Sequence, residues 1–175
     1  MRPFIAFLFC LLLGSSLAAQ KQKREPLSEA QQDQIAEAGV DPAARVELYV
    51  KFLDEQADTI RGLIKRAKSP ARSHRIDDEL QDFTALLDEL GDNLDVYSER
   101  KADVRKSLKG LNEGVQRWQA VLHDLPSDPG FEISLKDAVA SSSELADQTK
   151  QLTADQTAYF AAHKDEKGQD RAEPK

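Results

Sequence analysis

One pattern of apolar residues constrains this chain more than any other feature of its sequence. Steps of alternately four and three residues from Ile76 to Leu122 reach 14 positions, and 13 of them are apolar. An unbroken period of 3.5 residues is typical of a helix whose apolar stripe keeps facing a supercoiled partner. The pattern predicts one helix over residues 71–124, about 80 Å long at 1.5 Å per residue. The 14 positions are Ile76, Leu80, Phe83, Leu87, Leu90, Leu94, Tyr97, Lys101, Val104, Leu108, Leu111, Val115, Trp118 and Leu122.

An alternative interpretation places a break near Gly91. The run Leu90-Gly91-Asp92-Asn93 is typical of a helix end followed by a new N-cap, and a break there would give a conventional four-helix bundle with shorter helices. A glycine inside a helix costs only about 1 kcal/mol relative to alanine, which a stripe of this length can offset. We therefore favour the continuous helix, and the sequence leaves the break near Gly91 open.

Capping signals define the remaining helices. Ser28 and Gln31 have the spacing of a capping box, and Asp41 followed by Pro42 is an N-cap with proline in the first helical turn. The sequence predicts an all-α protein, an elongated antiparallel helical bundle or coiled coil. Its elements are three long helices at about 42–68, 71–124 and 132–163, with a short N-terminal helix at 29–38.

The short turn at Ser69-Pro70 folds the helix over 42–68 back on the next one, and the helix over 132–163 returns to cover residues 94–122. Charges agree with this register, although exposed ion pairs contribute only about 0.2–1 kcal/mol each. The expected neighbours are Tyr49 with Leu90, Lys51 with Asp88, and Arg61 and Lys65 with Asp77 and Asp78.

The N-terminus has the features of an export signal. Arg2 precedes the apolar run 4–13, and a stretch of mostly small residues follows over 14–19. Ten apolar residues are too few to cross a bilayer as a helix, which takes about 20. We expect a signal peptide at 1–19, cleaved after Ala18 or Ala19, and an exported protein, periplasmic or extracellular, without a transmembrane segment in the mature chain. The further divisions are a basic flexible N-terminus at 20–27, a helical domain at 28–163 and a disordered charged tail at 164–175.

The residues that usually carry chemistry are scarce. The only cysteine, Cys10, lies in the expected signal peptide, which removes thiolate metal sites and cysteine nucleophiles from the mature chain. The histidines, at positions 74, 123 and 163, have no spacing typical of a metal site. With 31 acidic against 24 basic residues, the chain has a formal charge of −7, which disfavours nucleic acid as a partner. We expect no enzyme activity, no metal and no cofactor.

One charge pattern indicates a binding surface. Residues 59–75 contain no acid, whereas residues 76–99 contain nine acids and no base. The basic side chains could contact an anionic lipid, a polysaccharide or an acidic protein. We favour the other interpretation, in which they select the register of the helices and stabilise the end of the helix over 42–68. The candidate patch consists of Arg61, Lys65, Arg66, Lys68, Arg72 and Arg75.

Two short runs resemble a motif of a known chaperone family. Leu27-Ser28-Glu29-Ala30-Gln31 and Leu152-Thr153-Ala154-Asp155-Gln156 are similar to the Leu-Thr-x-x-Gln motif that occurs twice in periplasmic chaperones of the Spy/CpxP family. The first copy has Ser for Thr, and the second lies inside the helix expected over 132–163. The resemblance implies an exported helical chaperone that holds unfolded clients on a concave surface.

We expect an exported, non-enzymatic helical protein with a binding or structural role in the cell envelope, whose partner is an unidentified protein or another envelope component. A holdase-type chaperone is one alternative. A self-associating coiled-coil scaffold, such as a homodimer, is the other, because two shorter helices would leave part of the long apolar stripe uncovered.

Overall fold

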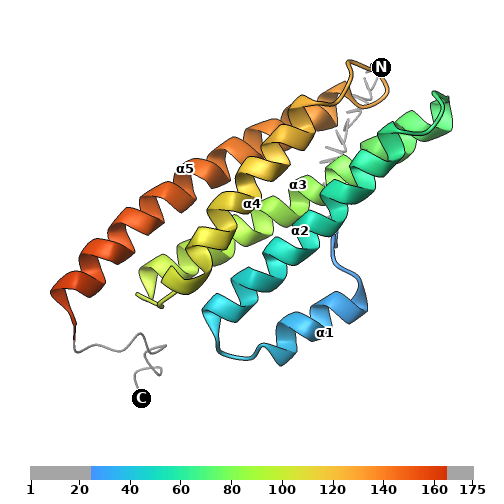
Figure 1. Ribbon diagram of the computed structural model, residues 1–175. Helices are drawn as coiled ribbons and strands as arrows, with labels where there is room; N and C mark the ends of the chain where they lie inside the picture. Colours follow the sequence, from blue (N-terminus) through green and yellow to red (C-terminus); the bar gives the residue numbers. More distant parts are fainter. Residues whose placement is uncertain (1–24, 165–175) are drawn as a thin grey trace, which may run out of the picture.

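The computed structural model describes residues 25–164, and this part of the chain forms five α-helices and no strand (Figure 1). The expected signal peptide, residues 20–24 of the basic N-terminus and residues 165–175 of the tail lie outside the described residues. No helix between residues 25 and 164 combines the length and apolar character that a membrane span needs. The helices are α1 (Glu29–Glu37), α2 (Pro42–Ile64), α3 (Pro70–Glu99), α4 (Arg105–His123) and α5 (Glu132–Ala162).

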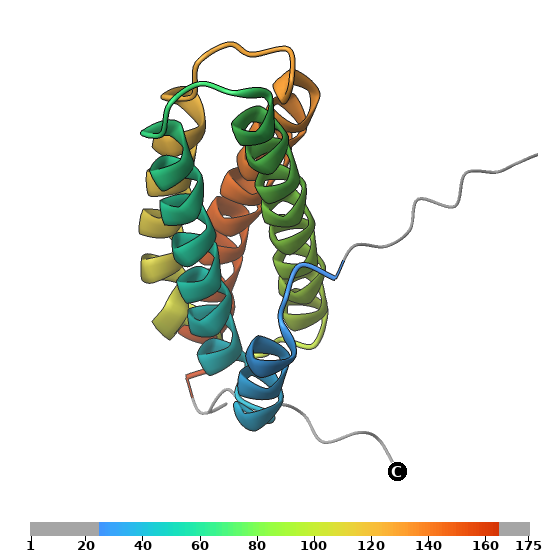
Figure 2. The same ribbon diagram turned by 90° about the vertical axis from the view of Figure 1, so that its right-hand side faces the viewer.

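Helices α2 to α5 form a four-helix bundle, and α1 packs against α2 beside it (Figures 1 and 2). Around the bundle the order is α2, α3, α5, α4, so that α3 and α4 lie on a diagonal although they are consecutive in the chain. Consecutive helices run in opposite directions (Figure 1). Each helix therefore has one antiparallel neighbour and one parallel neighbour, and α3 and α5 are a parallel pair.

The expectation of a single helix over 71–124 is wrong. Helix α3 ends at Glu99, the chain reverses direction, and α4 begins at Arg105. The alternative break at Gly91 is also absent, since α3 runs through that residue without interruption. The three-helix architecture is accordingly replaced by a bundle of four helices in which α3 and α4 are separate.

The apolar stripe is real even though the helix is not continuous. All 13 apolar positions of the pattern are buried, seven of them on α3 and the rest between Val104 and Leu122. Tyr97 and Val104 lie on the two sides of the turn and are seven positions apart, which is two steps of the pattern, so the stripe stays in phase across it. A period of 3.5 residues shows which side chains face a core. It does not show whether these side chains belong to one continuous helix or to two.

The polar exception in the stripe marks the reversal. Lys101 has a φ of +54°, the left-handed conformation that ends many helices. The Lys101 N–H donates to the Ser98 carbonyl at 3.2 Å, and the Ala102 N–H donates to the Tyr97 carbonyl at 2.9 Å. These two bonds form a Schellman motif with a lysine where glycine is usual, and the buried Ala102 follows it.

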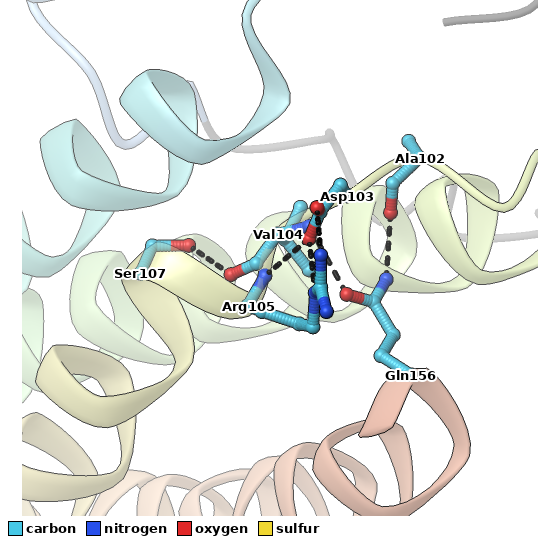
Figure 3. Close-up of polar contacts among 6 residues, drawn as sticks. All are labelled: Ala102, Asp103, Val104, Arg105, Ser107 and Gln156. Carbon is cyan, nitrogen blue, oxygen red and sulfur yellow. Dashed lines mark hydrogen bonds and ion pairs between the residues drawn. The ribbon is translucent and has the colours of Figure 1, made fainter. Parts of the chain in front are cut away.

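A buried glutamine of α5 closes the same turn (Figure 3). The Gln156 side chain donates from Nε2 to the Ala102 carbonyl at 2.6 Å and accepts at Oε1 from the Val104 N–H at 3.1 Å. Val104 caps α4 without a side-chain hydrogen bond of its own, and its carbonyl accepts from the Ser107 hydroxyl. One side chain therefore satisfies two backbone groups that lie inside the protein at the α3–α4 turn.

The other helix ends agree closely with the capping signals. Ser28 and Gln31 form both bonds of the capping box, Gly39 has a φ of +59°, and Asp41 accepts from two backbone N–H groups in the first turn of α2. Helix α2 ends at Ile64, four residues before the expected position. The N-terminal segment before α1 contacts the bundle, because Leu27 is buried and the Pro26 carbonyl accepts from Gln56 of α2.

A buried tyrosine joins α2 to α3 near the expected register. The Tyr49 hydroxyl donates to Glu89 at 2.6 Å, one residue from the predicted neighbour Leu90, and accepts from Asn93 at 3.3 Å. Burial, with the hydrogen bond to Glu89, raises the pKa of the Tyr49 phenol. The Tyr49 hydroxyl therefore stays protonated at neutral pH and donates to Glu89.

The substitution Lys101→Gly tests the left-handed turn. A residue with a Cβ loses stability in this conformation relative to glycine, so the variant is expected to raise the free energy of unfolding by about 0.5–1 kcal/mol. Urea denaturation followed by circular dichroism measures the change. The matched control is Arg100→Gly, one residue earlier with a φ of −78°, where glycine is expected to lower stability. A stability loss in Lys101→Gly would contradict the assigned geometry.

The substitution Gln156→Leu tests the closure of the turn. It leaves the Ala102 carbonyl and the Val104 N–H without partners in a buried place, and each such group costs about 1–3 kcal/mol. We expect a loss of about 2–4 kcal/mol in the free energy of unfolding. The exposed Gln151 on the same helix is the control, because its leucine variant should change stability by less than about 0.5 kcal/mol. Equal effects at both positions would show that Gln156 does not close the turn.

Candidate functional site

The predicted basic patch lies at the end of the bundle where α2 turns into α3. Five of its six members are exposed there, and Arg61 among them forms an ion pair of 2.7 Å with Asp58. Arg72 differs, since only 6% of its side chain is exposed. The surface that remains for an anionic partner consists of Arg61, Lys65, Arg66, Lys68 and Arg75.

Arg72 holds the bundle together at this end. Its Nη1 donates to the carbonyls of Ile64, at 3.4 Å, and of Arg66, at 3.0 Å, which are the free carbonyls at the end of α2. Its Nη2 lies 4.0 Å from Asp128 Oδ2, in the loop between α4 and α5. Arg72 is therefore a structural residue. Its burial corrects the prediction that it belongs to the binding patch.

Asp128 ties the α4–α5 loop to the first turn of α3. It accepts from the Gly130 N–H and from the Ser73 hydroxyl, each at 2.9 Å. These two bonds, with the charges of Arg72 and Lys68, lower the pKa of the Asp128 carboxyl. Gly130 permits the approach, because a Cβ there would lie 2.8 Å from that of Ser73.

A group of three side chains near this end has the geometry to hold a cation. His74, Asp77 and Asp78 each place one ligand atom within 4.8 Å of the others. Their spacing of i, i+3 and i+4 on a helix is visible in the sequence, and the expectation that no histidine has a metal-type spacing overlooked it. Each member already has a protein partner, since His74 lies 3.5 Å from Asp78 and Asp77 accepts from Ser134 and Gln81. The group therefore serves local structure as it stands.

Two of the charge contacts expected between α2 and α3 differ in the structure. Lys51 lies 3.9 Å from Glu55 on its own helix and donates to Gln34 of α1, and it does not pair with Asp88. Arg61 pairs with Asp58. Lys51 therefore does not neutralise Asp88 of α3.

Four acidic side chains gather in a groove between α3 and α5, the parallel pair that lies side by side in Figure 2. The groove has a volume of about 610 Å³. In the part of the chain that the structure describes, its four carboxylates form no ion pair, and no lysine or arginine lines it. Its lining consists of Leu87, Asp88, Gly91, Asp92 and Asp95 of α3 and Ser141, Glu144, Leu145 and Gln148 of α5.

A single glutamine fixes the width of the groove. Gln148 Nε2 donates to the Gly91 carbonyl at 3.0 Å and to Asp95 at 2.6 Å. A Cβ at Gly91 would lie 3.2 Å from Gln148 Oε1, so a larger residue there would crowd the Gln148 amide. Asp95 is oriented by this bond, whereas Asp88, Asp92 and Glu144 are exposed and free to turn toward a ligand.

A second hollow, between α4 and α5, has a different character. Its volume is about 380 Å³, and both signs of charge line it. Lys109 and Glu113 in its wall lie 3.9 Å apart and partly cancel each other. The α3–α5 groove is therefore the better candidate for a site that recognises charge.

The sequence indicated the acids of this groove and missed their partner helix. The run of nine acids without a base was evident, but the continuous helix placed the last helix against residues 94–122 only. The break at Lys101 brings residues 141–148 of α5 beside residues 87–95 of α3 instead. The groove could be recognised only once that reversal was known.

Comparisons of this chain with models of protein families, with curated proteins and with solved structures found no match. The two runs that resemble the Spy/CpxP motif have different settings here, since the first caps α1 and the second lies inside α5. The functional conclusion therefore rests on the geometry of the bundle.

The substitution Asp128→Asn tests the tie between α3 and the α4–α5 loop. Because folding lowers the pKa of this carboxyl, its contribution to stability is present above the pKa of the unfolded chain and is lost as the pH falls through the folded pKa. The difference in unfolding free energy between wild type and Asp128→Asn should be largest near neutral pH and shrink below about pH 4. Urea denaturation between about pH 2.5 and pH 7 measures it.

The Ser73→Ala background serves as the control for this measurement. It removes one of the two donors to Asp128, so the pH-dependent difference should be smaller in that background. A difference that stays constant over the whole pH range would show that the charge of Asp128 does not stabilise the joint.

Proposed function

We propose that this chain is an exported, non-enzymatic binding protein of the cell envelope, and that the groove between α3 and α5 is its binding surface. The observation that carries the proposal is the groove itself, a hollow of about 610 Å³. Within the described residues, no lysine or arginine forms an ion pair with its four carboxylates. Unneutralised charge at a concave place is typical of a surface that receives a charged partner.

The N-terminal sequence supports the export part of the proposal. The apolar run 4–13 and the mostly small residues before Gln20 have the arrangement of a cleavable signal. The buried core begins at Leu27, downstream of both expected cleavage positions. Removal of residues 1–18 or 1–19 would therefore leave the described core intact.

The stripe that motivated a self-associating scaffold is covered within one chain. Its 13 apolar positions are buried by the packing of α2, α3, α4 and α5 in the monomer. A second copy is therefore not needed to shield it from water. We therefore place the binding surface in the groove and not on an exposed coiled-coil stripe.

Site-specific photo-cross-linking tests the proposal in the cell envelope. A photoreactive amino acid at Ser141 lies in the groove, and one at the exposed Thr59 on α2 lies away from it. We expect a discrete adduct from position 141 and none from position 59, with the recovered protein beginning at Ala19 or Gln20 by intact mass. Circular dichroism verifies that both variants fold.

Two results would reject this proposal. Equal adducts from both positions, or none from position 141 in a folded protein, would show that the groove is not the binding surface. A chain recovered in the cytoplasm with residues 1–19 intact would reject the export part.

A further inference from the structure

We infer that the occupant of the α3–α5 groove is an extended segment of a partner protein with lysine or arginine at alternating positions. The inference rests on the proposed function and adds the chemistry of the ligand. It follows from the spacing of the carboxylates, their presence on both walls of the groove and the absence of competing cations among the residues that line it.

The spacing of the acids matches an extended chain. Asp88 and Asp92 are four residues apart on α3, which separates them by about 6 Å along the helix axis at 1.5 Å per residue. Residues two apart in an extended chain are separated by about 6.6 Å and point to the same side. Alternate basic residues of an extended segment lying along α3 therefore meet successive carboxylates.

The second wall of the groove suits long basic side chains. Glu144 of α5 lies across the groove from the acids of α3 and offers a carboxylate to the same segment. Leu87 and Leu145 also line the groove but are almost completely buried, so its accessible surface is mainly polar. The long, flexible stem of lysine lets its charged end reach a carboxylate on either wall.

Competing occupants fit the groove less well. In the described part of the chain, the group of side chains close enough to share a metal ion is His74, Asp77 and Asp78, outside the groove. The groove carboxylates do not converge on one point, so they suit several charges spread along a line. A second copy of this chain is disfavoured because the net charge of −7 makes two copies repel each other.

The test uses the mature chain and two fluorescent peptides of equal composition. In one peptide lysine alternates with serine over 11 residues, and in the other the same lysines form one block. Fluorescence anisotropy at low salt is expected to show binding of the alternating peptide, at least tenfold tighter than that of the blocked peptide. Electrostatic binding of this kind weakens as salt is added.

Matched charge variants locate the binding. The groove variant is D88N/D92N/E144Q, which leaves Asp95 and its bond to Gln148 in place. The control variant is D33N/E37Q/E113Q, which removes the same charge from exposed positions of α1 and α4. We expect the groove variant to bind the alternating peptide at least tenfold more weakly than wild type, and the control variant to differ by less than twofold. Thermal melts verify that both variants fold.

The outcomes separate this inference from the proposed function. Equal binding of the two peptides, equal losses in the two variants, or no binding by the folded wild type would overturn the inference about the ligand. If an adduct at Ser141 still formed in the envelope, the groove would remain the binding surface for a different partner. If that adduct were absent too, the proposed function would fall with the inference.

Discussion

The structure depends on how the chain closes the turn between α3 and α4. These helices lie on a diagonal of the bundle, so the connection crosses its end and buries Ala102 and Val104 completely. Buried backbone groups need hydrogen-bond partners, and Gln156 of α5 supplies one to each residue. The last turns of α5 therefore hold the reversal that separates α3 from α4.

The diagonal connection has a consequence for the rest of the molecule. It places α5 beside α3 in parallel as well as beside α4 in antiparallel orientation. The parallel pair forms the groove, and Gln148 of α5 joins the two helices by its hydrogen bond to the Gly91 carbonyl. At the opposite end of the bundle, Arg72, Ser73 and Asp128 tie the α2–α3 and α4–α5 connections together. The groove is thus supported by polar ties at both ends of the bundle.

Particular residues explain which expectations the structure supports. The N-caps Ser28 and Asp41 and the glycine at position 39 act within one helical turn, so local sequence determines them. Lys101 is the polar exception in the apolar stripe. A lysine does not indicate a left-handed turn residue as a glycine would, so the sequence does not predict the turn at this position. Arg72 shares its charge with its neighbours in the sequence, and only its burial distinguishes a structural arginine from a surface one.

The sequence by itself determined that the described chain is helical, where most helices begin and which side chains face the core, because these properties follow from local capping and from the period of the apolar residues. Tertiary structure decided where the long stripe is interrupted, which helices are neighbours and which charges remain unpaired. The reason is that the stripe positions on the two sides of the turn, Tyr97 and Val104, are seven positions apart, which keeps a 3.5-residue pattern in phase, so one pattern fits both a straight helix and a folded pair. Contacts such as that of Gln156 with Ala102, 54 residues away in the chain, select between the two.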